Sequence, residues 1–318
     1  MVGAEERLDA VLLARVRERA PLFPGDAFLP LDHECDAHCR SLPVRAGGND
    51  GGVDAEAVQD SVQEAVTAVP QPVRDVLDGV WLGNPLHPAL TDVPLGAWAT
   101  AAALDVLGHE AADEALAVGI LGALPAALTG LNDWSHLKGE SRQVGVLHAL
   151  LNSGALTLNV GSLLLRRRGH RGLARVLSGT AFLGTLYSAH LGGRLSFGLG
   201  VRVNRTAFEQ PRDRYAPVID ASALDDGKLH RVELEGEAVV LATCEDGDVC
   251  AISAVCSHLG GPLDEGKRDG DVVVCPWHGS RFDLRTGAVE GGPAVYPQPR
   301  YESRVRAGKV EIRAAKDD

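Results

Sequence analysis

The sequence lacks the excess of positive charge that nucleic-acid-binding proteins carry. It has 31 Lys and Arg residues against 43 Asp and Glu residues, which gives a net charge of −12. No basic footprint is present, and nucleic acid is therefore excluded as the main partner. Aromatic residues make up only 4% of the chain, and its six cysteines are too few and too unevenly spaced for a disulfide framework.

Two short signals are also missing. Residues 1–20 carry Glu, Asp and Arg throughout, so we expect no secretory signal peptide at the start of the chain. No Gly-rich dinucleotide or flavin fingerprint occurs at any position. The chain is therefore not expected to bind a nicotinamide or flavin cofactor of its own.

The chain has 318 residues, which is long enough for two or three domains. Its composition changes sharply along its length. The middle is strongly apolar and both ends are polar. We expect a polar N-terminal region at 1–79, a helical domain at 80–205 and a small domain at 215–318. Apolar residues at helical spacing within 54–69 predict an amphipathic helix that ends at Pro70.

A cluster of soft metal ligands lies in the N-terminal region. His33, Cys35, His38 and Cys39 fall within seven residues. They offer enough donors for zinc, but their spacing matches no closed tetrahedral motif. The Cys-x-x-Cys-His signature of a c-type haem is absent. Zinc binding and an ordinary surface loop both stay open.

The middle of the chain contains four apolar segments. A membrane-spanning helix needs about 20 mostly apolar residues. Three segments meet that length directly, and the first does so if Asp92 and Asp105 are tolerated. The alternative is the buried four-helix core of a soluble protein, but the segments have no polar face to show water. The segments are 93–104, 115–132, 144–165 and 176–193.

An even number of spans would place both ends of the domain on one membrane face, here called face A, and two of its links on the opposite face B. Short basic loops stay in the cytoplasm. Both faces carry basic residues, so the rule does not choose between them. Face B has Arg166, Arg167, Arg168 and Arg171, and face A has Lys138, Arg142, Arg194, Arg202 and Arg205.

Four histidines of this domain are expected near face A: His87, His136, His148 and His190. Ionisable groups within membrane spans are candidates for function. One hypothesis is a second site, in which His87, His148 and His190 hold a b-type haem, a metal ion or a quinone. The alternative is that these interfacial histidines bind lipid headgroups or helix ends.

Two short loops near the C-terminal end carry the clearest chemistry. One contains Cys256 and His258, and the other contains Cys275 and His278. Each loop offers one thiolate and one imidazole, and this mixed set is that of a Rieske [2Fe–2S] centre. Zinc accepts the same donors. The surrounding residues alternate as in half-buried strands, with Gly-Asp turns between them, which predicts a small all-β domain.

Residues 217–315 resemble the Rieske family, through both loops and through the proline-containing segment Gly291-Gly292-Pro293-Ala294. The resemblance implies that Cys256 and Cys275 hold the buried iron of a [2Fe–2S] cluster, and that His258 and His278 hold the outer iron. Two imidazoles place less negative charge on a cluster than two thiolates, which gives potentials from about −150 to +300 mV.

The sequence departs from the high-potential members of that family. They carry a disulfide between the two loops, at positions that match Gly261 and Trp277, and a tyrosine at the position of Phe282. Ser280 is retained and can donate a hydrogen bond to a sulfide. We therefore predict a potential below that of the quinol-oxidising class. Cys244 and Cys250 flank a turn and are expected to be small buried side chains, with no bridge between them.

Residues 80–205 resemble an uncharacterised bacterial family of four-helix membrane domains. The resemblance lies in the segment from Asn84 to Gly96 and in Leu191-Gly192-Gly193. It implies a membrane fold with no known chemistry, often joined to redox modules. The expected fold is thus multidomain, with a four-helix transmembrane bundle followed by a small all-β Rieske-type domain. We expect a multi-pass protein of the bacterial cytoplasmic membrane.

These expectations lead to three functional readings. The first is a membrane-anchored Rieske-type protein that transfers electrons through its cluster to a redox partner protein or a membrane quinone. The second is a small quinol or quinone oxidoreductase that uses the face-A histidines. The third is a membrane-anchored redox sensor. Only 40 residues follow His278, so we expect no oxygenase domain with a mononuclear iron site.

Overall fold

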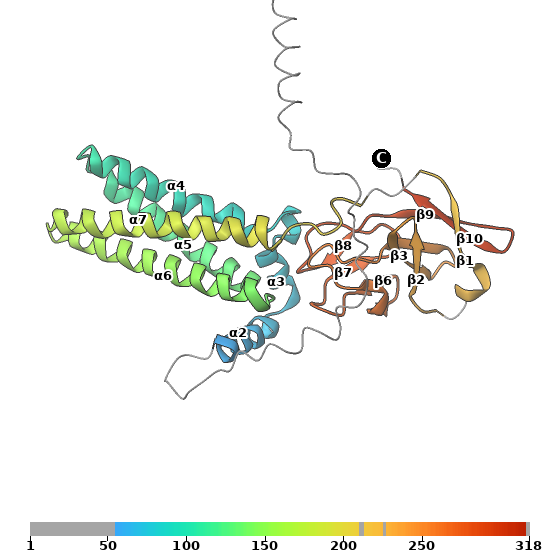
Figure 1. The fold of residues 1–318 in the computed structure, drawn as a ribbon. Helices are drawn as coiled ribbons and strands as arrows, with labels where there is room; N and C mark the ends of the chain where they lie inside the picture. The colour runs from blue at the N-terminus through green and yellow to red at the C-terminus, as the bar shows by residue number, and fades with distance from the viewer. Residues whose placement is uncertain (1–54, 210–212, 225–226, 316–318) are drawn as a thin grey trace, which may run out of the picture. The chain divides into compact units, whose positions relative to one another are not determined.

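The structure is a computed structural model that describes residues 55–209, 213–224 and 227–315. The Cys/His cluster at residues 33–39 lies outside these ranges, so its zinc or loop alternatives stay predictions. Residues 53–318 belong to one compact unit. Its helices come first in the chain and its strands follow, as the sequence predicts (Figure 1).

Two short helices precede the apolar region. Helix α2 spans Ala55–Ala68, which confirms the helix predicted at 54–69. Pro70 then precedes α3, Gln71–Asp78, because its fixed φ suits the residue before a first helical turn. Gly79 ends α3 in the left-handed conformation with φ 85°, and a single 3₁₀ turn, η1 (Val80–Leu82), leads into the long helices.

Four long helices contain the four apolar segments. Short turns join them, so they run alternately up and down, and α4 packs along α5 while α6 packs along α7 (Figure 1). Contacts between α5 and α6, and between α4 and α7, join the two pairs. The helices are α4 (Leu86–Val106), α5 (Ala112–Trp134), α6 (Gly139–Arg167) and α7 (Arg171–Gly193).

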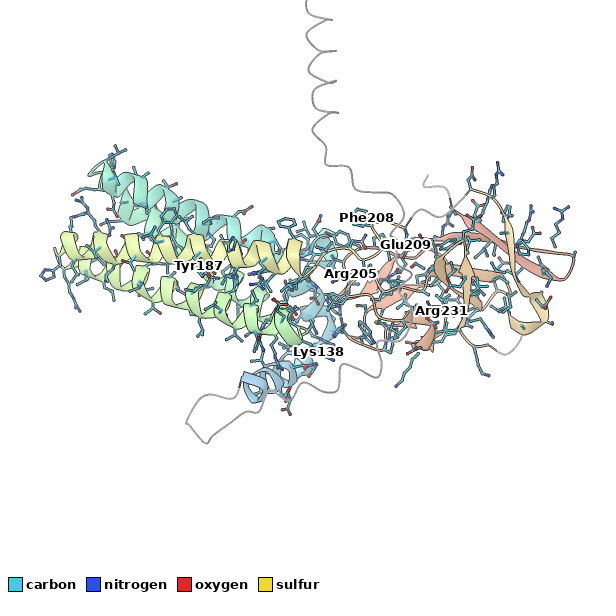
Figure 2. The ribbon with its side chains drawn as sticks, viewed as in Figure 1. Lys138, Tyr187, Arg205, Phe208, Glu209 and Arg231 are labelled. Carbon is cyan, nitrogen blue, oxygen red and sulfur yellow. A yellow bond between two sulfur atoms is a disulfide. The ribbon has the colours of Figure 1, made fainter. Side chains whose placement is uncertain are left out.

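The four helices bury mostly small or polar side chains, apart from Trp98, Leu116 and Leu191, and they expose many large apolar ones. Leu121, Leu150 and Leu183 are each more than half exposed, and Tyr187 projects from α7 in the same way (Figure 2). Gly119 shows how closely the helices approach, since a Cβ there would lie 2.2 Å from the Trp98 indole nitrogen. The buried polar side chains include Thr129, Asn132, Asn159, Ser162, Ser178, Thr185 and Ser188.

A buried ion cluster joins the helices at the face-B end. The guanidinium of Arg166 is fully buried and donates to Asp105 Oδ1 at 2.8 Å and to Asp113 Oδ1 at 3.0 Å. Arg171 adds a contact of 3.2 Å to Asp113. Asp105, a functional candidate from the sequence, is therefore a structural ion-pair partner between helices.

The C-terminal part is all-β, as predicted. Its strands form three antiparallel sheets, with the orders β1-β10-β9, β2-β3-β4 and β5-β6-β7-β8. Val232 and Leu234 of β2 point inward and Glu233 between them points outward, as the alternation predicts. The strands are β1 (Ala216–Asp220), β2 (His230–Leu234), β3 (Glu237–Thr243), β4 (Val249–Ser253), β5 (Lys267–Asp269), β6 (Val272–Val274), β7 (Arg281–Asp283), β8 (Val289–Gly291), β9 (Tyr301–Arg306) and β10 (Lys309–Ala314).

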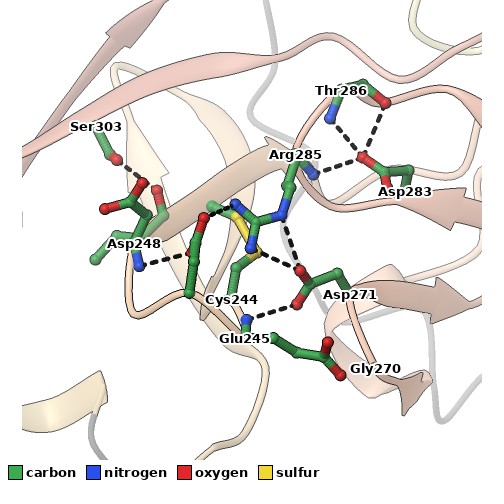
Figure 3. Close-up of a disulfide and its surroundings, with 12 residues drawn as sticks. Cys244, Glu245, Asp248, Gly270, Asp271, Asp283, Arg285, Thr286 and Ser303 are labelled. Atoms are coloured by element: carbon green, nitrogen blue, oxygen red, sulfur yellow. Dashed lines mark hydrogen bonds and ion pairs between the residues drawn. A yellow bond between two sulfur atoms is a disulfide. The ribbon is translucent and has the colours of Figure 1, made fainter.

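Cys244 and Cys250 form a disulfide across the β3–β4 turn (Figure 3). The expectation of two separate thiols was therefore wrong. The reason lies in the strand register: Ala242 pairs with Cys250, and Cys244 follows immediately after β3. The turn then returns the chain within disulfide reach, with a Cα–Cα distance of 6.0 Å.

Candidate functional site

Two similar loops present the four predicted ligand residues. The second loop is the turn of the β6–β7 hairpin, and the first follows β4. In the first, Cys256 N–H donates to Gly261 O at 2.9 Å and Gly260 N–H donates to Cys256 O at 2.8 Å. In the second, Cys275 N–H donates to Ser280 O at 2.8 Å and Gly279 N–H donates to Cys275 O at 3.1 Å. Because the two loops share this hydrogen-bond pattern, the backbone around each Cys/His pair has a similar conformation.

Glycine is required where the two loops meet. A Cβ on Gly261 would lie 2.8 Å from Cys275 Sγ and 3.1 Å from the Trp277 ring. The two positions that carry a disulfide in high-potential relatives therefore face each other here, and neither holds a cysteine. Gly260 and Gly279 allow the turns, because both have a left-handed φ, 81° and 76°.

The two cysteines lie buried beside each other as free thiols. A hydrogen bond from Cys256 lowers the pKa of Cys275 to about 6, and the same contact raises the pKa of Cys256. One thiolate is thus available near neutral pH, and thiolates are the ligands that iron–sulfur clusters need. Ser280 is fully buried, accepts from Ala294 N–H at 3.1 Å and hydrogen-bonds to Cys256.

The two histidines lie edge to face, with 5.2 Å between their ring centroids. Burial lowers the pKa of both His258 and His278, which keeps the imidazoles neutral and able to bind a metal. The Nδ1 atom of His258 is buried and has no hydrogen-bond partner. Since buried polar atoms are almost always partnered, this orphaned nitrogen fits an iron ligand. The donor set and its protonation therefore fit a [2Fe–2S] cluster.

A third loop, the proline loop around Gly292 and Pro293, supports the site. The hydroxyl of Ser257, which lies between the ligands of the first loop, donates to Tyr296 O at 2.7 Å. The peptide bond between Gly292 and Pro293 in this loop is cis. The linker after α7 also holds this region, because Arg205 N–H donates to Ser257 O of the first ligand loop at 3.0 Å, and Ser253 Oγ at the end of β4 donates to Glu209 at 2.8 Å. Figure 2 labels Arg205 and Glu209.

The helical part contributes to the site one of the histidines expected near face A, for which the sequence predicted no role at the cluster. His136, in the turn between α5 and α6, lies edge-on to both ligand histidines, with ring-centroid distances of 5.8 Å to His258 and 5.4 Å to His278. Burial, together with the nearby His278, lowers the pKa of His136 to about 3. The expected position of His136 near face A, just after the second apolar segment, was the only sequence feature that indicated a place close to the cluster domain.

The other face-A histidines do not gather at one point. The ring centroids of His87 and His148 lie 6.3 Å apart, whereas the ring of His190 stacks against Tyr187. Both ring nitrogens of His148 have partners, Ser188 O at 2.9 Å and the Asn152 amide at 3.1 Å. Within the described ranges, no group of three or more His, Cys, Asp or Glu side chains converges on a single metal ion, and this holds for the four ligands of the two loops too, which would share a two-iron cluster. The described residues thus give no support to haem b at this position.

Comparison with known proteins agrees with this geometry. Residues 214–302 match the model of the Rieske [2Fe–2S] domain, and residues 83–205 match that of a predicted membrane protein family, DUF2231. The mouse (Mus musculus) protein apoptosis-inducing factor 3 is 35% identical over 101 residues, 32% of this chain. This chain covers only 16% of the length of that protein.

Two smaller relatives are covered by this chain over almost their whole length. Ferredoxin CarAc of Metapseudomonas resinovorans is 36% identical over 100 residues, 31% of this chain and 92% of the ferredoxin. A solved ferredoxin of carbazole 1,9a-dioxygenase from Nocardioides aromaticivorans IC177 is 31% identical and is covered completely by 33% of this chain, with a TM-score of 0.30. The chain therefore belongs to the Rieske [2Fe–2S] domain family through residues 214–302, and it carries a DUF2231 domain at residues 83–205.

Proposed function

We propose that this protein is a membrane-anchored electron carrier. Cys256 and Cys275 would hold one iron of its [2Fe–2S] cluster, and His258 and His278 would hold the other. The cluster supplies one-electron redox chemistry when bound. The observation that carries the assignment is the orphaned Nδ1 of His258, buried in a site that also holds the two free thiols.

The residues around the cluster have separate tasks in this proposal. The Ser280 hydroxyl stabilises negative charge on Cys256, as its hydrogen bond to that side chain indicates. Phe282 and Leu263 are fully buried in the core that contains both cysteines, and they exclude water from the thiolate side. The histidine side is covered by His136 of the helical part.

Membrane anchoring is supported by the surface of the helices. Within the described residues, α5 with 23 residues and α6 with 29 residues are long and apolar enough to cross a membrane. The helices α4 and α7 also expose large apolar side chains, Val93 and Val106 on α4 and Leu173, Leu183 and Leu186 on α7. Water-soluble bundles bury their leucines, whereas helices in lipid pack through small residues. We infer a multi-pass domain of four spans in the bacterial cytoplasmic membrane, with lipid around it.

The disulfide supports a proposal for the side of the membrane on which the β-domain lies. Disulfides persist in oxidising compartments and are rare in the cytosol. The Cys244–Cys250 bridge therefore favours a β-domain on the extracytoplasmic side. The basic turn with Arg167 and Arg168 would then lie at the cytoplasmic end, although face A carries basic residues too and the rule for basic loops does not by itself choose this orientation.

A redox protein is the partner that we propose. CarAc is a ferredoxin by name, and this chain covers 92% of its length at 36% identity. A quinone or haem at His87 and His148 has less support, because Ser188 and Asn152 occupy both ring nitrogens of His148. We therefore favour electron transfer between proteins over quinol oxidation.

Iron and acid-labile sulfide analysis of the purified full chain tests the proposal, together with EPR spectroscopy of the reduced protein. We expect a Rieske-type signal that is lost in Cys256→Ser and in His258→Ala. The Cys244→Ser/Cys250→Ser double variant is the control and should keep the signal, because those sulfurs are bonded to each other. Stoichiometric zinc with no iron would contradict the assignment.

A further inference from the structure

The histidine edge of the site faces the helical part of the chain. Only 6% of His258 and 8% of His136 are exposed, and the two rings meet edge-on. His136 belongs to the turn that joins α5 to α6, whereas His258 belongs to the first ligand loop. The His258 part of the edge through which Rieske imidazoles can exchange electrons is thus covered from within the same chain, whereas His278, also in edge contact with His136, is half-buried.

One arginine ties three segments together beside this edge. Arg202, which follows α7, donates to Pro293 O at 2.8 Å and to Asp78 O at 2.6 Å. Its guanidinium also lies 3.4 Å from Asp78 Oδ1 and 3.3 Å from Asp133 Oδ1. All three side chains are less than 10% exposed. Arg202 therefore joins α3 and α5 of the helical part to the proline loop of the β-domain.

The backbone of Arg202 supports a special role. Its φ is +61°, in the left-handed region that residues other than glycine rarely adopt. Such a conformation costs free energy and persists only where surrounding contacts hold it. Here the contacts are the two buried carboxylates and the two carbonyl oxygens. Breaking a buried pair leaves a charge without a partner, so these contacts act together.

Helix α3 completes the polar contact with the proline loop. Gly292 N–H donates to Asp75 Oδ1 at 2.8 Å, and Gln71 Nε2 donates to Gly292 O at 3.4 Å. A Cβ on Gly292 would lie 2.8 Å from Asp78 Oδ2, so only glycine fits the contact. Interfaces between domains that move relative to each other are polar in this way, whereas permanent interfaces are larger and more hydrophobic.

We propose that the end of the helical part is a docking surface that closes the histidine edge of the Rieske domain, with His136 as its cover and Arg202 as its clamp. A soluble redox protein must approach His258 and His278, so it exchanges electrons quickly only after the clamp releases. The proposal rests on the proposed function, in which these two histidines are the outer-iron ligands.

The test compares two oxidants of the reduced full chain in detergent micelles, by stopped flow. Ferricyanide is small, and cytochrome c has the size of a protein partner. The variant is Arg202→Gly, because glycine accepts the left-handed φ and removes the clamp. The matched control is Arg304→Gly, which breaks an ion pair to Glu311 between β9 and β10.

We expect Arg202→Gly to speed oxidation by cytochrome c by about tenfold or more, and oxidation by ferricyanide by much less. The control should change neither rate. His136→Ala removes the cover and leaves the clamp, so it should raise the rate of oxidation by cytochrome c as well. This variant replaces Arg202→Gly in the test if Arg202→Gly does not fold. An unchanged cytochrome c rate in both variants, with intact EPR signals, would overturn the docking surface.

A second measurement separates this proposal from the assignment of the cluster. Diethyl pyrocarbonate modifies accessible histidines, and mass spectrometry reads the rate at each position. In the protein without iron, His258 should react slowly in the wild type and about tenfold faster in Arg202→Gly. Protection without any cluster signal would retain the docking surface and reject the ligand assignment. Equal reactivity in both proteins would reject the docking surface.

Discussion

His136 lies 5.4 Å from His278, measured between ring centroids, with an angle of 66° between the two ring planes. A residue of the helical part therefore forms the wall of a site whose four predicted ligands all belong to the β-domain. Because His136 is buried and neutral, it contributes shape and exclusion of water, and no charge. The electrostatic surroundings of the cluster then depend on the contact between the two parts of the chain.

Removal of this wall should change the redox potential. With two thiolates and two neutral imidazoles, the oxidised cluster is neutral and the reduced cluster carries one negative charge. Water that enters in His136→Ala stabilises the charged form, so we expect a higher midpoint potential. An EPR-monitored redox titration measures it, and His190→Ala is the control because His190 stacks against Tyr187. A midpoint equal to that of the wild type would contradict this role of His136.

The wild-type potential should lie below that of the quinol-oxidising class. Gly261 faces Trp277 where those proteins have a disulfide, and the fully buried Phe282 has no hydroxyl to donate. Fewer hydrogen bonds to a cluster stabilise its reduced state less. We expect a midpoint below about +200 mV, and a higher value in Phe282→Tyr. A wild-type midpoint above that limit would show that other contacts dominate.

The stability of the protein should depend on pH through Asp78. Burial raises the pKa of this carboxyl from its ordinary 3.8 to about 6, although Arg202 and the Asn132 amide oppose the shift. The charges of Asp133 and Asp75 act in the same direction as burial. Asp78 thus binds its proton more tightly in the folded state, and the stability it contributes below pH 3.8 is lost as the pH rises through about 6.

Asp78→Asn removes this titration and tests the prediction. The difference in melting temperature between Asp78→Asn and the wild type should grow in favour of the variant from pH 4 to pH 7, the range that these two pKa values bracket. Asp220→Asn, which removes an exposed carboxylate paired with Lys309, is the control for the loss of a surface ion pair. A difference independent of pH would mean that Asp78 is already ionised throughout this range.

The sequence was sufficient where structure and chemistry are local. Each ligand loop is a short segment with its donors at fixed spacing, so Cys256, His258, Cys275 and His278 were identified as candidates without the fold. The four helices were also predicted, because long apolar runs need no distant partner to be visible. The order of helices followed by strands came from the change of period between residues 205 and 215.

Contacts between distant segments were not predicted. No periodicity relates His136 to His258 or Arg202 to Asp78, since these pairs meet only when the two parts of the chain pack. The Cys244–Cys250 bridge is a different kind of omission. Cys250 pairs across the hairpin with Ala242, so a strand register assigned from the sequence would have brought the two sulfurs together.

A charge on the outer surface of α6 distinguishes a membrane domain from a soluble bundle. Leu150 lies near the middle of α6 and is 64% exposed. In water, Leu150→Asp should be harmless, whereas at the centre of a bilayer it costs about 2.5–3.5 kcal/mol. We expect loss of the protein from the membrane fraction. Leu107→Asp, exposed beyond the end of α4, should remain in that fraction.

The disulfide should be oxidised in the cell and should stabilise the β-domain. Closing a loop between cysteines separated by six positions lowers the entropy of the unfolded chain and contributes about 2 kcal/mol. Cys244→Ser/Cys250→Ser should therefore melt at a lower temperature than the wild type, and the ion pairs from Arg285 to Asp246 and Asp271 should retain part of the turn (Figure 3).

If the β-domain is extracytoplasmic, alkylation of intact cells should leave both sulfurs unmodified until a reductant is added, and a C-terminal alkaline phosphatase fusion should be active. Free thiols in freshly alkylated cells, with an inactive fusion, would place the β-domain in the cytoplasm and restrict its partners to that compartment.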